Sequence, residues 1–158
     1  MPIQIKEAEI HNIDEILKMI REFAAFENLS DFCEVNEETL RAALFGETKC
    51  AEAILVFEDE KAVGYAIFYP NFASFRGQRG LYLEDLYVKP EYRGSRVGES
   101  ILKHIAKLAK TRGLERIDFL VLDWNEKAIR FYEKLGAKAD AEESHFKFVG
   151  EAFMNLAS

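Results

Sequence analysis

Residues 81–122 constrain the fold most, because strand and helix patterns alternate within them. A strongly apolar run at 81–88 ends at Lys89 and Pro90, and a second run follows at 116–122. Between them, apolar residues recur at helical spacing until Gly113: Ile101, Leu102, Ile105, Leu108 and Ala109. A strand, a helix and a strand in this order predict a right-handed crossover that joins two parallel strands.

Apolar periodicity and turn residues predict the remaining elements. They are a strand at 3–5, a helix at 13–24 with Asn12 as N-cap, a helix between Asn36 and Gly46, an antiparallel hairpin of strands 51–57 and 62–69, a loop at 70–80, a helix at 125–134 capped by Asn125 and ended by Gly136, and a final hairpin with a strand at 145–149. Strands that pair in both directions, with helices between them, predict an α/β (α+β) fold around one mixed central sheet flanked by helices.

Size and charge narrow the class of protein. The chain has 158 residues and 49% hydrophobic content without a linker-like run, so we expect a single domain over 1–158. Its net charge of -7 argues against a nucleic-acid partner, because phosphate backbones require a basic face. An acidic surface is compatible with a small cationic substrate, although solubility alone also explains it.

Several further classes receive no support from the sequence. It has no basic segment followed by an apolar one near Met1 and no apolar run long enough for a membrane span, so we expect a cytoplasmic protein without membrane attachment. Cys33 and Cys50 are expected to stay reduced and structural. The three histidines, His11, His104 and His145, are not spaced as metal ligands. No Ser/His/Asp order in the sequence indicates an acyl-enzyme.

The turn RGSRVG at residues 93–98 joins the strand to the helix of the crossover. The first N–H groups of a helix have no intrahelical partner and the dipole is positive there, so a phosphate would fit. Arg93 and Arg96 add positive charge. The turn is neither a Walker A loop nor a dinucleotide GxGxxG motif. The alternative to an anion site is an ordinary turn in which glycine only allows the tight backbone conformation.

Two acids, Glu84 and Asp85, interrupt the apolar strand 81–88. Because side chains alternate along a strand, we expect them to point to opposite faces, with at least one partly buried. A buried carboxylate is costly without a partner, which favours a functional role. The alternative is a strand end whose acids reach water or pair with an arginine.

The order of elements, the turn YRGSRVG after LYLEDLYV, and the segment WNEKAIRFYEKLGA resemble the GCN5-related N-acetyltransferase (GNAT) superfamily. Arg93 and Gly98 fit its signature, whereas Arg96 occupies the position of its first glycine. EFAAFENLSD, VLDWNEKAIRFYEKLGA and VGEAFMNLA resemble the diamine and thialysine N-acetyltransferase branch in order and spacing. Residues 71–80 are less similar, since Phe75 stands where the branch has tryptophan.

The resemblance implies an acetyl-CoA site where the two central parallel strands splay apart, with no metal. The pantetheine arm would lie along Leu86, Tyr87 and Val88. The pyrophosphate would rest on the turn, formed by Arg93, Gly94, Ser95, Arg96, Val97 and Gly98. Asn125 would approach the cofactor, and an ordinary N-cap is an equally good interpretation of this residue.

The resemblance also implies roles in catalysis. Glu84 would be the base that deprotonates the amine, directly or through water, while Asp85 would bind a distal ammonium or hold structure. Tyr132 would protonate the departing thiolate, with packing as its alternative role. Glu27 would hold the far amino group of the acceptor, or would simply be solvated.

The predicted function is therefore acetyl transfer from acetyl-CoA to a primary amine of a small cationic acceptor, such as a polyamine, a diamine or a thialysine-like amino acid. Two alternatives remain open. One is the same reaction on a protein or peptide amine, and the other is a module that binds acetyl-CoA without catalysis. The branch is homodimeric, so the resemblance also implies a homodimer.

Overall fold

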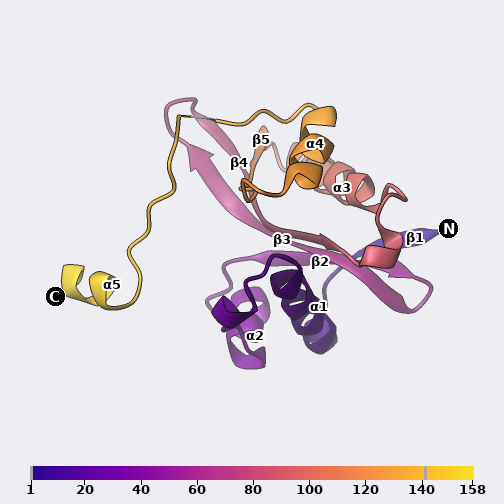
Figure 1. Ribbon diagram of the computed structural model, residues 1–158, viewed down its shortest axis with the longest axis horizontal. Coiled ribbons are helices and arrows are strands. Elements are labelled where there is room, and N and C mark those ends of the chain that lie inside the picture. Colours follow the sequence, from indigo (N-terminus) through magenta and orange to yellow (C-terminus); the bar gives the residue numbers. More distant parts are fainter. Residues whose placement is uncertain (1, 141) are drawn as a thin grey trace. The chain divides into compact units, whose positions relative to one another are not determined.

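A computed structural model describes residues 2–140 and 142–158 (Figure 1). The chain forms two compact units, one up to Leu120 and one from Val121 onward. Each unit is described by itself below. The expectation of a single domain over 1–158 stays a prediction.

The first unit is built on a mixed sheet. Its strands lie in the order β1 (Ile3–Glu7), β2 (Glu52–Glu58), β3 (Lys61–Ala73), β4 (Gln78–Val88) and β5 (Arg116–Asp118). Neighbours from β1 to β4 pair antiparallel, and β5 pairs parallel to β4. The predicted fold class, including the crossover, is confirmed.

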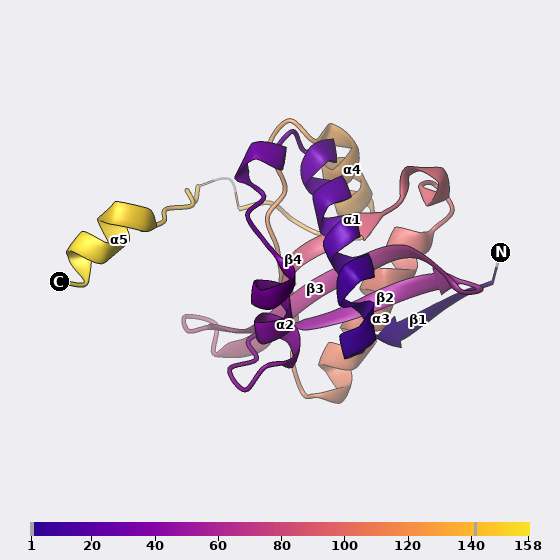
Figure 2. The same ribbon diagram turned by 90° about the horizontal axis from the view of Figure 1, so that it is seen from below.

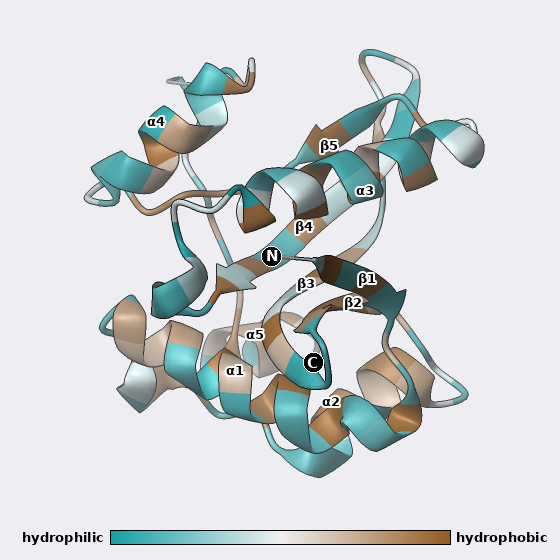
Figure 3. Cartoon of the chain, turned by 90° about the vertical axis from the view of Figure 1, so that its right-hand side faces the viewer, coloured by the Kyte–Doolittle hydropathy of each residue, from teal (hydrophilic) through white to brown (hydrophobic). Residues whose placement is uncertain are grey.

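Helices cover both faces of this sheet (Figures 1 and 2). On one face, α1 (Ile13–Phe26) and α2 (Glu37–Phe45) bury Ile16, Met19 and Leu40 against the strands. On the other face, α3 (Val97–Thr111) buries Ile101 and Ile105 in a second core. Each of these helices carries hydrophobic and hydrophilic residues, as expected for amphipathic helices at a sheet (Figure 3).

Strand β5 is much shorter than the predicted strand at 116–122. It pairs with β4 over three positions only, Gly80 with Arg116, Leu81 with Ile117 and Tyr82 with Asp118. Within residues 2–120, β4 therefore has no strand partner on this edge beyond Tyr82. This early end of the parallel pairing agrees with the expected splaying of the two strands.

The hairpin of β3 and β4 is longer than the sequence predicts. Residues 70–80 were expected to form a loop, but β3 continues to Ala73 and β4 begins at Gln78. Pro70 is tolerated in the strand because it lies beyond Phe68, where the pairing of β3 with β2 ends, so that β3 has an open edge at this position. Gly77, at φ 63°, turns the chain at the tip.

The starts of α1 and α2 are capped differently. The helix predicted to begin near Asn36 does so, and the Asn36 side chain caps it by accepting a hydrogen bond from the Thr39 N–H at 2.9 Å. Asn12 precedes α1, but its Oδ1 accepts from the Glu9 N–H at 2.8 Å and makes no cap to α1. The short 3₁₀ helix Ile10–Asn12 turns the Asn12 side chain backwards along the chain.

The second unit contains α4 (Glu126–Lys134) and α5 (Gly150–Leu156). Asn125 caps α4, accepting from the Ala128 N–H at 3.3 Å, as predicted. The predicted strand at 145–149 is wrong, because those described residues form neither a strand nor a hairpin. A strand requires a partner edge, and Phe146 and Phe148 remain 90% and 65% exposed in the chain described.

Candidate active site

A β-bulge in β4 places the two strand acids on one face of the sheet. The register shifts so that Ile67 lies opposite Asp85 while Phe68 lies opposite Leu83. Glu84 is therefore the extra residue, with no β3 residue opposite it in the strand register. Glu84 and Asp85 then accept hydrogen bonds from two tyrosines of the same face of β3. The prediction that these acids point to opposite faces is wrong, because the extra residue interrupts the alternation.

Asp85 is the more buried of the two acids. Its Oδ2 accepts a hydrogen bond from the Tyr65 hydroxyl at 2.8 Å. Burial raises the pKa of Asp85 from 3.8 to about 6, the Tyr65 hydrogen bond opposes this rise, and the negative charge of Glu84 adds to it. The carboxylate is therefore held in a site that favours a bound cation or a proton.

Glu27 completes this acidic cluster from the end of α1. It follows the last residue of the helix as its C-cap. Its pKa is raised by burial and by the negative charge of Asp85, so these two acids lie within electrostatic reach of each other. Glu27, Glu84 and Asp85 were all predicted site residues, and the first unit brings them together.

Replacing Asp85 by asparagine is expected to stabilise the protein at pH 8 by about 1–3 kcal/mol. The magnitude follows because a difference of one in pKa between the folded and unfolded states corresponds to about 1.36 kcal/mol. The folded pKa of about 6 lies above the ordinary 3.8, so the ionised form costs stability above pH 6 and the cost vanishes below about pH 4. Urea unfolding at pH 8, 6 and 4 measures the difference. An equal gain at all three pH values would contradict this origin, and the exposed Asp140→Asn is the matched control.

Tyrosines form the remaining wall around the acids. The Tyr69 hydroxyl donates to Glu84 Oε2 at 3.4 Å, and the Tyr69 ring stacks on Tyr82 with centroids 5.1 Å apart. Burial and the charge of Glu84 raise the pKa of both hydroxyls, so they stay protonated. The sequence reasoning missed Tyr65, Tyr69 and Tyr82, although the period-two spacing of Tyr65 and Tyr69 on β3 places them on one face.

The free edge of β4 presents alternate backbone groups. The Lys89 N–H donates to the Val63 carbonyl at 2.9 Å, and the Tyr87 carbonyl lies against Gly64 of β3. Since backbone groups alternate in direction along a strand, those of Leu86 and Val88 point to the opposite edge, where β5 no longer pairs. Of the three predicted edge residues, Leu86 and the N–H of Val88 are thus available to an extended ligand, whereas Tyr87 bonds to β3 and the Val88 carbonyl accepts from Arg93 Nε at 2.8 Å.

The turn before α3 has the conformation that an anion site requires. Gly94 and Arg96 have positive φ values of 80° and 66°, and Arg96 is the N-cap of α3. A Cβ on Gly94 would meet nothing within 4 Å, so the turn leaves space above itself. With the exposed Arg96 side chain and the first N–H groups of α3, which the helix itself does not bond in its first turn, this cradle fits a pyrophosphate. Val97 is buried and anchors the helix to the core.

Replacing Arg96 by glycine is expected to stabilise the fold by about 0.5–1 kcal/mol. The left-handed conformation costs an L-residue about 1–2 kcal/mol, and the greater freedom of glycine in the unfolded chain offsets part of the gain. Thermal or urea unfolding measures the change. Arg96→Ala keeps the strain and serves as the matched control, and a loss of stability in the glycine variant would contradict the assignment.

Asn125 and Tyr132 lie in the second unit. Asn125 caps α4, and Tyr132 lies on the same helix with its ring edge toward Phe131, at a centroid distance of 5.1 Å. Tyr132 is partly exposed. Their roles toward the cofactor stay predictions.

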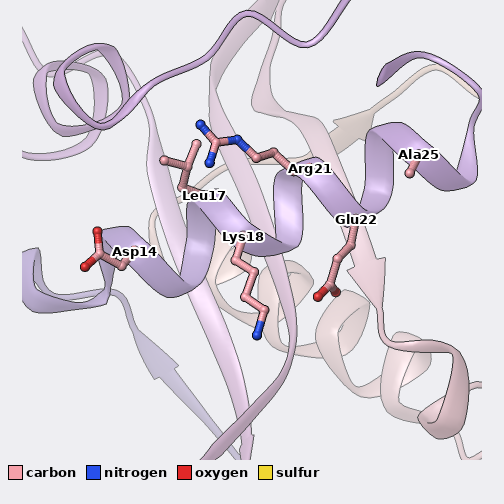
Figure 4. A pocket seen from close by; sticks show the side chains of 6 residues that line it. All are labelled: Asp14, Leu17, Lys18, Arg21, Glu22 and Ala25. Carbon is pink, nitrogen blue, oxygen red and sulfur yellow. The ribbon is translucent and has the colours of Figure 1, made fainter. Parts of the chain in front are cut away.

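Other features of the described residues do not enlarge the site. An open groove runs along one side of α1, and its lining residues all come from that helix: Asp14, Leu17, Lys18, Arg21, Glu22 and Ala25 (Figure 4). Among the described residues, no three His, Cys, Asp or Glu side chains gather as metal ligands. No helix in that part of the chain combines the length and the apolar character of a membrane span. Cys33 and Cys50 are both free.

A splayed strand edge, a helix start that can hold an anion and an acidic cluster are compatible with an acyl-CoA-dependent transferase. The chain belongs to the Acetyltransferase (GNAT) family, whose model matches residues 17–137, and it is an acetyl-transferring enzyme. This finding confirms the predicted superfamily.

Known relatives refine the assignment within the family. The chain is 43% identical to thialysine N-epsilon-acetyltransferase of Bos taurus over 98% of its length and 97% of that protein. It is 34% identical to the human spermidine/spermine N(1)-acetyltransferase-like protein 1 over 98% of its length and 24% of that protein. A solved integron cassette protein from the mobile metagenome of V. cholerae matches with a TM-score of 0.83 and 26% identity, covering 99% of this chain and 98% of that one. The predicted resemblance to the diamine and thialysine branch is confirmed.

Proposed function

We propose that this enzyme transfers the acetyl group of acetyl-CoA directly to a primary amine of a small cationic acceptor, of the diamine, polyamine or thialysine type. The observation that carries the proposal is the acidic cluster of Glu27, Glu84 and Asp85 beside the free edge of β4. Three neighbouring carboxylates, of which Asp85 and Glu27 are half-buried, suit a substrate with two ammonium groups, because burial without countercharge is unfavourable. The names of the relatives point to the same class of acceptor.

The donor would lie on the residues of the strand edge and the turn. Leu86 and Val88 would bond the pantetheine amides, and the turn 93–98 with the start of α3 would hold the pyrophosphate. Asn125 would contact the cofactor from the start of α4. Acetyl-CoA supplies the acetyl group as a reactive thioester.

The three acids would have different roles toward the acceptor amine. An alkyl ammonium has a pKa of about 10.4, so its nitrogen must lose a proton before it can attack a thioester. Glu84, the less buried acid at the bulge, would accept this proton directly or through a water molecule. Asp85 and Glu27 would hold the distal ammonium, and Tyr132 would donate a proton to the departing thiolate.

The test uses the purified full chain with acetyl-CoA and a panel of amines: thialysine, lysine, spermidine, 1,3-diaminopropane and a lysine-containing peptide. Acetylated product is measured by mass spectrometry, because the free thiols Cys33 and Cys50 would add a background to a thiol dye. We expect turnover of the small diamines. Turnover of the peptide alone would favour a protein acceptor, and calorimetric binding of acetyl-CoA without any turnover would indicate a non-catalytic module.

The proposal includes a homodimer. Its support is the second unit, where large apolar side chains of the described tail are exposed: Phe146, Phe148, Val149, Phe153, Met154 and Leu156. Several exposed large apolar side chains in one segment are typical of an interaction surface. Light scattering is expected to give twice the monomer mass of 18.2 kDa, and a monomeric mass at micromolar concentration would contradict it.

A further inference from the structure

Arg93 makes contacts in two directions that a simple phosphate ligand does not need. Its Nε donates a hydrogen bond to the Val88 carbonyl at 2.8 Å. Its guanidinium lies 4.3 Å from the centre of the Phe26 ring and 5.5 Å from that of Tyr87. The side chain therefore joins the turn before α3 to both β4 and α1.

The first contact lies at the donor side of the site. The Val88 carbonyl is the last backbone acceptor on the free edge of β4 before the turn. Arg93 satisfies this carbonyl from the turn itself, so the conformation of residues 93–98 and the end of the free edge are fixed together.

The second contact lies at the acceptor side. Phe26 is the last residue of α1, and the acid Glu27 follows it as the C-cap. Tyr87 strengthens the same junction, since its hydroxyl donates to Glu22 at 3.2 Å and its ring stacks on Phe23 at 5.5 Å. The position of Glu27 thus depends on a helix end against which Arg93 stacks.

We propose that Arg93 is a positioning residue that couples the two substrate sites, so that a ligand on the turn 93–98 orders the end of α1 and with it Glu27. The inference rests on the proposed function, because it takes residues 93–98 as the donor site and Glu27 as an acceptor ligand. Arginine suits this role better than lysine, because a planar guanidinium stacks on an aromatic ring with its face while its Nε donates in the plane of the guanidinium.

The test follows amide hydrogen exchange with coenzyme A as the probe, in the full chain without acceptor. The reporters at the end of α1 are the N–H groups of Glu27, Asn28 and Leu29, which bond to carbonyls of residues 23–25. In the unmodified enzyme, coenzyme A is expected to slow exchange both at the start of α3 and at these three amides. In Arg93→Lys and Phe26→Leu it is expected to slow exchange at α3 only.

A matched control is Phe32→Leu, which removes an exposed ring near the same helix end and is expected to keep both effects. Kinetics give a second measurement: both coupling variants are expected to raise the acceptor KM about 5-fold or more at saturating acetyl-CoA, with a smaller change in kcat. Slowing at both places in Arg93→Lys and Phe26→Leu, or an unchanged acceptor KM, would overturn the inference alone. Absence of slowing at α3 in the unmodified enzyme would overturn the donor site as well.

Discussion

Replacing Tyr132 by phenylalanine is expected to lower kcat about 100-fold or more, because a positioned general acid contributes about 10²–10⁴ in rate. The change removes one hydroxyl and leaves the packing of the ring on Phe131 in place. Without a proton donor, coenzyme A would have to leave as a free thiolate. Steady-state kinetics with saturating acetyl-CoA and diamine measure the effect.

The melting temperature and the acetyl-CoA affinity of this variant should match those of the unmodified enzyme, which separates loss of a proton donor from loss of structure. The same hydroxyl change at Tyr92, which hydrogen-bonds Glu58 at the end of β2, provides a comparison outside the proposed chemistry. An unchanged kcat in the Tyr132 variant would remove the assigned role and leave this tyrosine as a packing residue.

The second large effect is expected for Glu84→Gln, which should lower kcat/KM about 100-fold at pH 7.5. Only about one amine in a thousand is neutral at that pH, given an ammonium pKa of about 10.4. Glutamine keeps the size and accepts the Tyr69 hydrogen bond, but it cannot take a proton. The acetylation rate is measured from pH 6.5 to 9.5.

High pH is expected to rescue this variant, because the neutral fraction of the amine increases about 100-fold between pH 7.5 and 9.5. The unmodified enzyme should gain much less over the same range. Glu60→Gln, in the exposed turn between β2 and β3, is the matched control and should leave the profile unchanged. A parallel pH profile for the Glu84 variant and the unmodified enzyme would show that Glu84 is not the base.

Most of the sheet and its helices could be predicted because apolar periodicity reports directly on burial. The crossover from β4 through α3 to β5 follows from this signal, and so does the amphipathic helix α1. The long hairpin did not follow, because Pro70 suggests a loop until its place on the open edge of β3 is known. The prediction of a strand at 145–149 was wrong because the alternation of Phe146 and Phe148 indicates a strand, whereas a strand forms only where another strand edge is available for pairing.

The sequence predicted which acids belong to the candidate site, but it did not predict how they are arranged. Glu27, Glu84 and Asp85 were all named from the sequence, and the first unit brings them together. Their common face depends on the bulge, which no composition or spacing in residues 81–88 reveals. The tyrosines around them were missed because each one, taken alone, has the ordinary features of a core aromatic.

The bulge at Glu84 also determines which changes of chain length the enzyme can tolerate. Deleting the extra residue here would remove the bulge: Leu83 and Asp85 would keep their partners Phe68 and Ile67, but β4 would regain strict alternation and could no longer present two consecutive acids on one face. Insertions at the tip of the hairpin, residues 74–77, would leave that register intact. In the divergence of such enzymes, insertions and deletions should therefore accumulate at the tip and be excluded from the strand.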